Sequence, residues 1–437
     1  MTSTVANLYQ QSWGKNIIAP PSEVTVPRWI DDIKIHGGDQ SCLAFGLGRS
    51  YGDSCLNQDG HIFDMSRLNQ IIHWDINDGL IHVHAGISIA DLLSFVIPHG
   101  WFVPVTPGTK FVTLGGAIAN DVHGKNHHRV GTIGRFIKTL TLLRSDGTIL
   151  TCSTSQNVEV FRATIGGLGL TGIILTVELQ LVFASSWIEV ETIPFFGIEE
   201  FTNLSTESQS YEYTVAWIDC VDAWNPWGRG LFMRANHSPN DRKPPKQKPK
   251  LSVPINCPTY MLNRYSCKAF NEIYYRVNSR SVEKKMVHYD PFFYPLDAVH
   301  DWNRIYGKHG FYQYQFVVPF SEKDGVVEIL NRISRSGFAS FLAVLKTFGH
   351  QSSPGILSFP RPGYTLTLDL ANRGQKTVKL LHELTEIVLE AKGRLYPAKD
   401  SVMTPRDFQS FYPEWEQFAP HRDKGFSSNF SRRVGVG

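Results

Sequence analysis

Short segments that alternate between apolar and polar residues fill the chain from about residue 40 to residue 185. Residues 80–85 (LIHVHA) alternate strictly, and this period of two predicts a strand with one buried face. Ser88 precedes the next apolar run and Asp91 stands three residues later, which predicts a helix with a capping box that ends at Pro98. Further strands are predicted at 41–46, 137–143, 148–152 and 173–183, and a short helix at 158–164.

The pattern changes after residue 183. Strands are predicted at 213–218, 311–318, 338–348 and 364–370, and helices from Ser321 to about Gly337 and over 375–392, with Gly393 at the end. This order of elements predicts an α+β unit with an antiparallel sheet flanked by helices. Residues 240–250 (NDRKPPKQKPK) are basic and rich in proline, so a mobile surface loop is predicted at about 239–262.

Composition narrows the class of protein. The 437 residues suggest two or three domains, and 42% apolar with 19% charged residues exclude a disordered chain or a coiled coil. A net charge of +3 argues against a nucleic-acid partner. We expect neither a signal peptide nor a transmembrane helix, because no long apolar run is present. The six cysteines form no CxxC pair and are expected to be free thiols in a reducing compartment.

Three glycine-rich stretches are candidates for binding a phosphate. In the run from Gly46 to Asp53 (GLGRSYGD) the third glycine comes one residue too late for a dinucleotide fingerprint, and no helix follows. Residues 167–172 match that fingerprint by letter, but a helix precedes them and a strand follows. The third stretch, 107–126, is rich in small residues. Two such loops in a strand-rich region predict a diphosphate held by backbone amides without a Rossmann helix.

The order of these motifs resembles a known cofactor domain. GLGRSYGD, HAGISIADLL, VTLGGAIANDVHGKNHH and GGLGLTGII occur as in the PCMH-type FAD-binding domain of the vanillyl-alcohol-oxidase superfamily, which has two α+β subdomains. DVHGKNHH, YQYQFVVP, LKTFG, LSFPRPG and RLYPAKDS resemble, more specifically, the decaprenylphosphoryl-β-D-ribose 2′-oxidase family, from Trp13 to the C-terminus. The resemblance implies an FAD domain at 1–183, a substrate domain at 184–393, and a segment 394–437 that returns to the FAD domain.

The resemblance also implies how the cofactor is held. Some members of the superfamily tether FAD to a histidine where this chain has Tyr51, so non-covalent FAD is expected. The implied cofactor contacts are Gly46, Gly48, Arg49, Ser50, Tyr51, Gly52, Gly108, Thr113, Gly115, Gly116, Asn120, His123, Gly124, Ile174 and Tyr396.

Other side chains have two interpretations from position alone. Lys399 is either a solvated loop lysine or an active-site group, and Lys346 either reaches the surface or points into a pocket. The resemblance favours the pocket for both. The implied catalytic residues are Lys399, Lys346, His123, Lys125 and Gln315. The implied substrate contacts are Tyr51, Trp217, Gln313, Gln315, Lys346, Thr365, Thr367 and Lys399, with Gln315 preferred to Gln313; Tyr51 and Trp217 serve equally well as core residues.

Two features of the sequence bear on alternatives. His123, His127 and His128 share one run, but cysteine or carboxylate spacing typical of zinc is missing, so no metal is expected. Thr365 and Thr367 stand where well-known members of the family have asparagine and cysteine, which leaves the sugar and lipid preference open.

The resemblance implies FAD-dependent oxidation of the C2 hydroxyl of a polyprenyl-phosphate-linked pentose to a ketone. A separate short-chain NAD(P)H reductase would complete a ribose-to-arabinose epimerisation, and a quinone or oxygen would reoxidise the flavin. The expected location is cytoplasmic or peripheral at the inner membrane. The alternatives are an aldonolactone or alditol oxidase, an oxidase of another nucleotide- or antibiotic-linked sugar, and a flavin-binding envelope scaffold protein without turnover.

Overall fold

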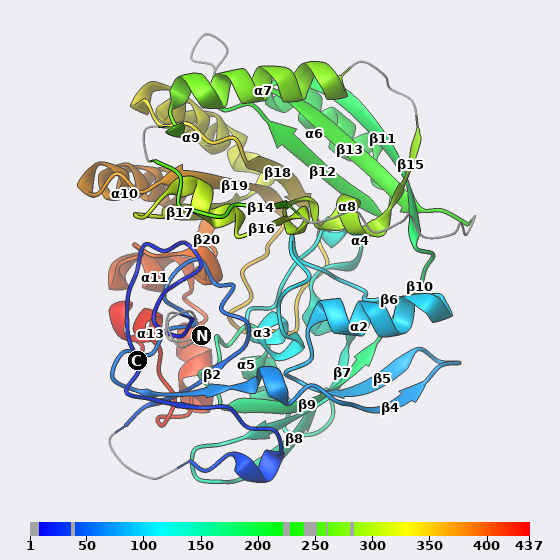
Figure 1. The fold of residues 1–437 in the computed structure, drawn as a ribbon, viewed down its shortest axis with the longest axis vertical. Coiled ribbons are helices and arrows are strands. Elements are labelled where there is room, and N and C mark those ends of the chain that lie inside the picture. Colours follow the sequence, from blue (N-terminus) through cyan, green and yellow to red (C-terminus); the bar gives the residue numbers. More distant parts are fainter. Residues whose placement is uncertain (1–7, 36–39, 222–227, 240–250, 259–260, 280–283) are drawn as a thin grey trace.

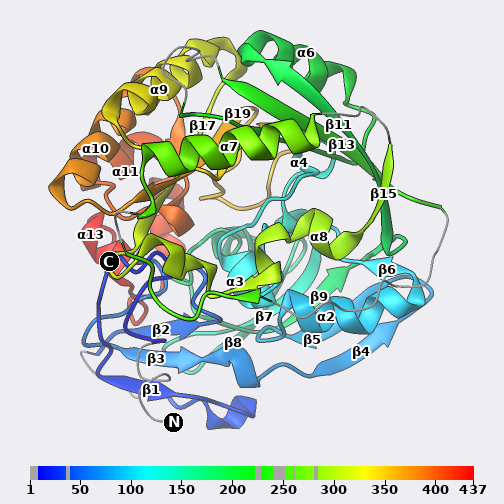
Figure 2. The ribbon, with the colours of Figure 1, turned by 45° about the horizontal axis from the view of Figure 1, so that its top comes forward.

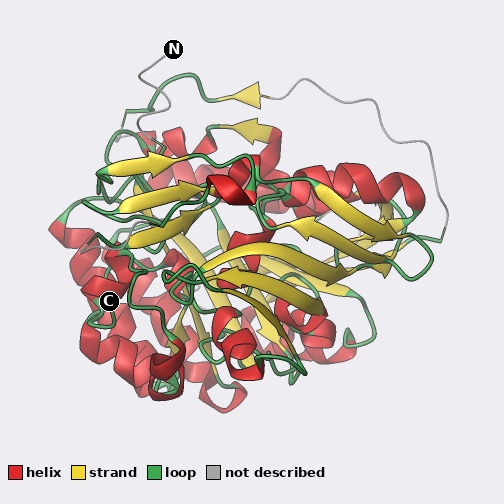
Figure 3. Ribbon diagram, turned by 90° about the horizontal axis from the view of Figure 1, so that it is seen from below, coloured by secondary structure: helices red, strands yellow, loops and turns green. Residues whose placement is uncertain are grey.

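The chain folds into two halves that face each other (Figure 1). The structure is a computed structural model that describes residues 8–35, 40–221, 228–239, 251–258, 261–279 and 284–437. The upper half in Figure 1 is one large sheet with helices, and the lower half holds smaller sheets and the C-terminal helices. Figure 3 shows the strands gathered in the middle of the molecule with helices around them.

The lower half is built mainly from the first 183 residues. Its five-stranded antiparallel sheet has the order β4-β5-β9-β7-β8, its parallel sheet the order β1-β3-β2, and β6 pairs with β10. The strands are β1 (Glu23–Thr25), β2 (Cys42–Phe45), β3 (His61–Asp64), β4 (Ile71–Asp75), β5 (Leu80–His84), β6 (Trp101–Phe102), β7 (Ile137–Leu143), β8 (Ile149–Ser153), β9 (Ile173–Gln180) and β10 (Val182–Phe183). The helices are α2 (Ile89–Val96), α3 (Leu114–Ala119), α4 (His127–Val130) and α5 (Val158–Thr164).

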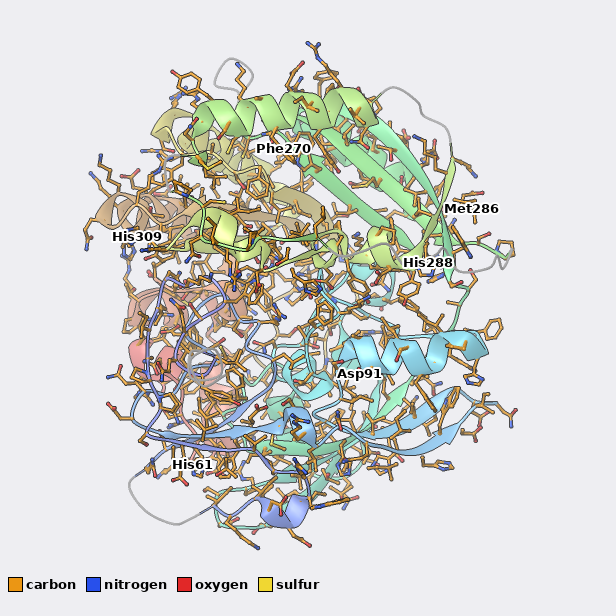
Figure 4. All side chains as sticks on the ribbon, in the orientation of Figure 1. His61, Asp91, Phe270, Met286, His288 and His309 are labelled. Atoms are coloured by element: carbon orange, nitrogen blue, oxygen red, sulfur yellow. The ribbon has the colours of Figure 1, made fainter. Side chains whose placement is uncertain are left out.

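Local sequence signals explain several of these elements. The Ser88 hydroxyl accepts from the backbone N–H of Asp91 at 3.0 Å, which confirms the predicted start of α2; Asp91 is labelled in Figure 4. The predicted hairpin of β7 and β8 is also confirmed, and Gly147 takes the left-handed conformation (φ 85°) that its turn requires. The predicted strand at 173–183 is interrupted at Leu181, where the backbone N–H donates instead to Gly79.

The upper half is one antiparallel sheet of eight strands in the order β15-β11-β13-β12-β18-β19-β17-β20. They are β11 (Trp187–Phe196), β12 (Tyr213–Ile218), β13 (Arg229–His237), β15 (Lys285–His288), β17 (Phe311–Val318), β18 (Ala343–Phe348), β19 (Gly363–Ala371) and β20 (Arg394–Leu395); β14 (Leu251–Ser252) pairs separately with β16 (Val299–His300). The helices of this half are α6 (Gly197–Glu207), α7 (Arg264–Asn278), α8 (Tyr289–Phe293), α9 (Lys323–Ser336) and α10 (Gln375–Glu390). The C-terminal helices α11 (Pro405–Phe411), α12 (Trp415–Phe418) and α13 (Asn429–Arg433) belong to the lower half.

The two faces of this sheet differ in polarity. On β19, Leu366, Leu368 and Leu370 pack into a core shared with α6, α9 and α10. The alternate residues Thr367 and Asp369 are on the opposite face, because successive strand side chains point to opposite sides. One face is therefore a hydrophobic core, and the other presents buried polar groups to the lower half.

Three predicted boundaries were wrong. Ser321 does not cap a helix: a short 3-10 turn, Phe320–Glu322, comes first and α9 begins at Lys323. The strand predicted at 338–348 begins only at Ala343, since the Ser340 hydroxyl donates to the carbonyl of Leu342 and competes with the sheet ladder. α10 ends at Glu390, and the left-handed residue after it is Lys392 (φ 51°) rather than Gly393.

The C-terminal segment lies against the beginning of the chain. The backbone N–H of Cys42 donates to Gly425 at 2.7 Å, and that of Tyr51 donates to Ala398 at 3.1 Å. Arg433 on α13 forms ion pairs with two buried carboxylates, Asp53 at 2.7 Å and Asp400 at 2.9 Å. These contacts support a split FAD domain of 1–183 and 394–437; the division itself stays a prediction.

Two further predictions concern the surface. Residues 240–250 of the predicted basic loop lie outside the described residues, and within the described part of that stretch 251–252 form β14. Every helix in the described part of the chain is too short or too polar to cross a membrane.

The Arg433 contacts make a stability test. Replacing Arg433 by alanine leaves two carboxylates, each at most 5% exposed, without their cation, so we expect a loss of about 3 kcal/mol in the free energy of unfolding. Arg406→Ala is the control, because its pair with Glu386 is exposed and is expected to contribute less than about 1 kcal/mol. Urea unfolding measures both; equal losses would contradict a special role for Arg433.

Candidate active site

A cavity of about 430 Å³ lies between the two halves, within the size range of small-molecule sites. The glycine loops after β2 and before α3 line one side, and the polar face of the large sheet lines the other. Figure 2 looks between α7 and α8 toward α3, which lies at the glycine-loop side. Segment 293–302 and residues 396–399 complete the wall.

The first glycine loop offers unpaired backbone donors. Within the described part of the chain, the backbone N–H groups of Leu47, Gly48 and Arg49 donate to no other backbone group. Gly48 is left-handed (φ 60°), and a turn of this kind turns successive N–H groups into a concavity that takes an anion. A Cβ atom on Gly46 would lie 2.3 Å from the hydroxyl oxygen of Thr113, so glycine also allows the two loops to approach.

The second loop brings backbone to the cavity wall. Thr113 caps α3 by accepting from the N–H of Gly116 at 3.1 Å. A Cβ atom on Gly108 would meet no protein atom within 4 Å, so this residue opens directly onto the cavity. The buried Oδ1 atom of Asn120 has no hydrogen-bond partner among the described residues. Free amides, an unpartnered acceptor and an open glycine fit a dinucleotide cofactor such as FAD held mainly by backbone.

Three lysines line the same cavity, and Lys346 acts electrostatically on the other two. Lys125 precedes α4, Lys346 lies on β18, and Lys399 ends a 3-10 turn in the returning segment. Burial lowers the pKa of Lys346 to about 8, and burial together with the charge of Lys346 lowers the pKa of Lys125 and of Lys399 to about 7. The Lys399 Nζ atom lies 5.6 Å from the centre of the Tyr51 ring. These amines can therefore exchange a proton near neutral pH.

Hydrogen bonds fix the state of His123. Thr365 donates its hydroxyl proton to the carbonyl of Phe316 at 2.8 Å, so its oxygen accepts from Gln315 Nε2 at 3.1 Å. The same amide nitrogen lies 2.9 Å from His123 Nε2, which must accept. Burial first, and then Lys346 and Lys399, lower the pKa of His123 well below its usual value. The imidazole is thus neutral, and its proton is on Nδ1, which is buried and has no partner in the described part of the chain.

Most residues that the sequence singles out meet at this cavity. All the predicted cofactor contacts line it except Gly52, which instead packs against the backbone carbonyl of Asp400. Gln315 and Thr365 also do not line it. Gln315 donates to His123, and Thr365 accepts from the same amide nitrogen of Gln315. The remaining predicted catalytic and substrate residues do line it: Lys125, His123, Lys346, Lys399, Tyr51, Trp217, Gln313 and Thr367.

Some residues at the site were missed from the sequence. Segment 293–302 contributes Asp297 and Trp302 to the wall, and nothing in its local pattern indicates a site. Asp369 is fully buried, and its carboxylate accepts a hydrogen bond from Gln313 Nε2. Its period-two spacing from Thr365 and Thr367 is a signal that could have placed it on the same face.

The comparisons with known proteins agree with this geometry. The family model described as an FAD binding domain matches residues 16–153. Decaprenylphosphoryl-β-D-ribose oxidase of Mycolicibacterium smegmatis is 36% identical over 91% of this chain and 90% of that protein. An uncharacterised protein of Streptomyces coelicolor is 31% identical over 80% of this chain and 100% of that protein. L-gulonolactone oxidase of Bos taurus is 30% identical over 46% of this chain and 47% of that protein.

The glycine loops at 46–49 and 108–116 form a cradle of backbone groups for the cofactor. The fold, this cradle and these matches define an FAD-dependent oxidoreductase, an α+β protein with a PCMH-type FAD-binding domain. Within that class, the chain belongs to the decaprenylphosphoryl-β-D-ribose oxidase family. The predicted fold class, cofactor and family are confirmed.

Gly108 allows the cradle to be tested. A valine there meets no atom of the described residues near its Cβ position, so Gly108→Val should fold, and its melting temperature should equal that of the unmodified protein when both are freed of FAD. Its side chain would occupy the cavity, so the purified protein should carry much less FAD, measured as flavin released per chain on denaturation. Full FAD content in the folded variant would show that the cofactor does not approach this residue.

Proposed function

We propose that this protein oxidises the C2 hydroxyl of a pentose carried on a polyprenyl phosphate to the ketone. The observation that carries the proposal is the cluster of three half-buried lysines and one neutral, buried histidine that line the cavity together with the glycine loops. A phosphate needs cations, and an alcohol that loses a hydride must also lose a proton. The name of the M. smegmatis relative supplies the substrate class, a ribose on decaprenyl phosphate.

Each group around the cavity has a role in this proposal. FAD, when bound, supplies the acceptor for the hydride of the carbinol carbon. Lys399 in its neutral form takes the hydroxyl proton, since its pKa of about 7 leaves a large fraction of free amine at neutral pH. Lys125 and Lys346 hold the phosphate, and His123 lines the cavity as a neutral imidazole. FAD is bound non-covalently, because Tyr51 lacks the imidazole that a histidyl bond needs.

The wider reaction follows from the same chemistry. A 2-keto sugar returns to an alcohol of opposite configuration only with a hydride donor, so a separate NAD(P)H-dependent short-chain reductase is the proposed partner for a ribose-to-arabinose epimerisation. A quinone or oxygen reoxidises the flavin. An aldonolactone oxidase is the second candidate, and it is supported by the L-gulonolactone oxidase match, which covers about half of each chain.

Substrate and base are tested together. Anaerobic mixing with a polyprenyl-phosphate pentose should bleach the flavin absorbance faster than mixing with aldonolactones or alditols. The rate should fall as the pH drops below about 7, because protonated Lys399 cannot accept a proton. Lys399→Met should slow bleaching by roughly 100-fold or more.

Lys376→Met, at an exposed position in the first turn of α10, is the matched control and should bleach like the unmodified protein. Bleaching by aldonolactones alone would favour the second candidate. Bleaching by the lipid-linked pentose with Lys399→Met unimpaired would remove Lys399 from the base role.

The proposed lipid substrate requires a peripheral contact with a membrane, and α7 offers a surface for it. Tyr265, Phe270, Ile273 and Val277 are 84%, 48%, 64% and 62% exposed and follow one side of the helix; Phe270 is labelled in Figure 4. Tyr274 of the same helix lines the cavity, so this apolar stripe borders the site. Three basic and one acidic residue on α7 give it a positive charge that suits anionic lipid.

Vesicle sedimentation tests this contact. Ile273→Glu with Val277→Glu should weaken binding to phosphatidylglycerol-containing vesicles by roughly tenfold or more, because two exposed apolar side chains can no longer enter the lipid. Ile149→Glu is the control, since it is equally exposed (54%) but lies on β8, far from α7 in Figure 1. Equal loss in both variants, or no vesicle binding by the unmodified protein, would contradict the assignment.

A further inference from the structure

The wall of the cavity changes from polar to apolar on the large sheet. On β18, Lys346 and Val344 are two residues apart, so both side chains point to the cavity side. The strand register places Val344 opposite Trp217 on β12. Val215 of the same strand is opposite Met233 on β13. All four apolar residues line the cavity, so they form a continuous floor that begins beside Lys346 and extends over two strand spacings, about 10 Å.

Helix α7 supplies a side wall to this floor. Tyr274 lines the cavity, and its ring centre lies 4.9 Å from that of Trp217. The Nε1–H of Trp217 donates to the carbonyl of Phe341 at 3.2 Å, so the polar atom of the indole has a partner and the ring presents apolar surface. Leu296, from the segment after α8, also lines the cavity. We call the surface formed by the following residues the apolar groove: Val215, Trp217, Met233, Tyr274, Leu296 and Val344.

The floor of the apolar groove is not part of a hydrophobic core. Val215, Trp217 and Val344 belong to neither of the two large cores of the described residues. Ala216 and Leu345, the next residues on the same strands, do belong to the core on the other face of the sheet. Apolar side chains that face a cavity are stabilised when an apolar ligand removes them from water. The apolar groove therefore fits an apolar ligand.

Two of the lysines mark one end of the groove. Lys346 extends from the same strand as the floor. The carbonyl of Lys125 accepts from the backbone N–H of Thr214 at 2.9 Å, directly before Val215. The Nζ atom of Lys125 donates to the carbonyl of Phe292 on α8 and lies 4.3 Å from the centre of that ring. Cations at one end of an apolar channel match an anionic head group that is followed by an apolar chain.

We propose that the apolar groove binds the isoprenoid chain of the substrate, beginning with the units next to the phosphate. The chain continues along Tyr274 toward the exposed apolar stripe of α7. In Figure 2 the view toward α3 passes between α7 and α8, which lie on either side of this path. The identity of the sugar rests on the proposed function, but the groove and its lysines can be probed with phosphates that carry no sugar.

Isothermal titration calorimetry of the holoenzyme with dimethylallyl, geranyl and farnesyl phosphate tests the groove. These probes share one phosphate and differ by apolar units of five carbons, and each is used below the concentration at which it forms micelles. The affinity should rise by roughly tenfold or more from dimethylallyl to farnesyl phosphate, because the added carbons are removed from water. Inorganic phosphate should displace farnesyl phosphate, because both need the lysines.

Tyr274→Ser removes the side wall of the groove and leaves the lysines in place. Farnesyl phosphate should bind roughly tenfold more weakly to this variant, whereas inorganic phosphate should bind as it does to the unmodified protein. Tyr275→Ser is the matched control, since Tyr275 is the next residue on α7 and contacts Arg229 and Phe196 instead of lining the cavity. Flavin released per chain shows that each variant is folded.

Val344→Phe carries the test if Tyr274→Ser does not fold, because it fills the groove from the sheet and phenylalanine is well tolerated in strands. It should also weaken farnesyl phosphate more than inorganic phosphate.

Three results would overturn the proposal: equal affinity for the three isoprenoid phosphates, equal loss in Tyr274→Ser and Tyr275→Ser, or farnesyl phosphate that inorganic phosphate does not displace. Bleaching of the flavin by aldonolactones alone would instead refute the proposed function. A dependence of affinity on chain length that disappears in Tyr274→Ser would support the groove even then, so the two failures are distinguishable.

Discussion

The gathering of three half-buried lysines around one cavity is the constraint that organises this molecule. Ammonium groups in a confined site repel one another and lose water, and both effects favour the neutral amine. The cavity therefore holds fewer charges near neutral pH than its composition suggests. An anion that enters reverses this balance, because it stabilises the ammonium form, so binding of a phosphate is coupled to proton uptake. The same property leaves Lys399 able to act as a base.

The large sheet makes such a cavity possible. Its alternation gives one largely apolar face, packed against α6, α9 and α10, which stabilises the strands independently of the site. The other face is then free to carry glutamine, threonine, aspartate and lysine side chains at fixed register. The C-terminal segment completes the wall of the cavity. The carbonyl of Ala398, in the turn Pro397–Lys399, accepts a hydrogen bond from the backbone N–H of Tyr51, and Arg433 forms an ion pair with Asp400. Lys399 and the glycine loop are thus positioned by the same contacts.

Much of this arrangement could be predicted from the sequence where the signal is local. Alternation located the strands, the Ser88 spacing located α2, and contiguous glycine runs located the cradle. Predictions were wrong where a side chain competes with the backbone, as Ser340 does before β18. Asp369 was missed because its importance depends on β17 and β19 being neighbours, and strand order is not written in any short pattern. Lys399 was identified through resemblance, since a loop lysine alone is ordinary.

Thr365 on the large sheet is connected by hydrogen bonds, through Gln315, to His123 in the other half of the protein. A threonine hydroxyl has one proton, and here the backbone carbonyl of Phe316 takes it. The oxygen must then accept from Gln315, and the second proton of the same amide nitrogen points at His123 Nε2. An asparagine side chain at this position could either donate to Gln315 or accept from it. It would therefore not determine which atom of the Gln315 amide faces His123. The threonine therefore fixes the tautomer of a histidine that lies outside the sheet, and the Nδ1–H of that histidine is left buried without a partner among the described residues.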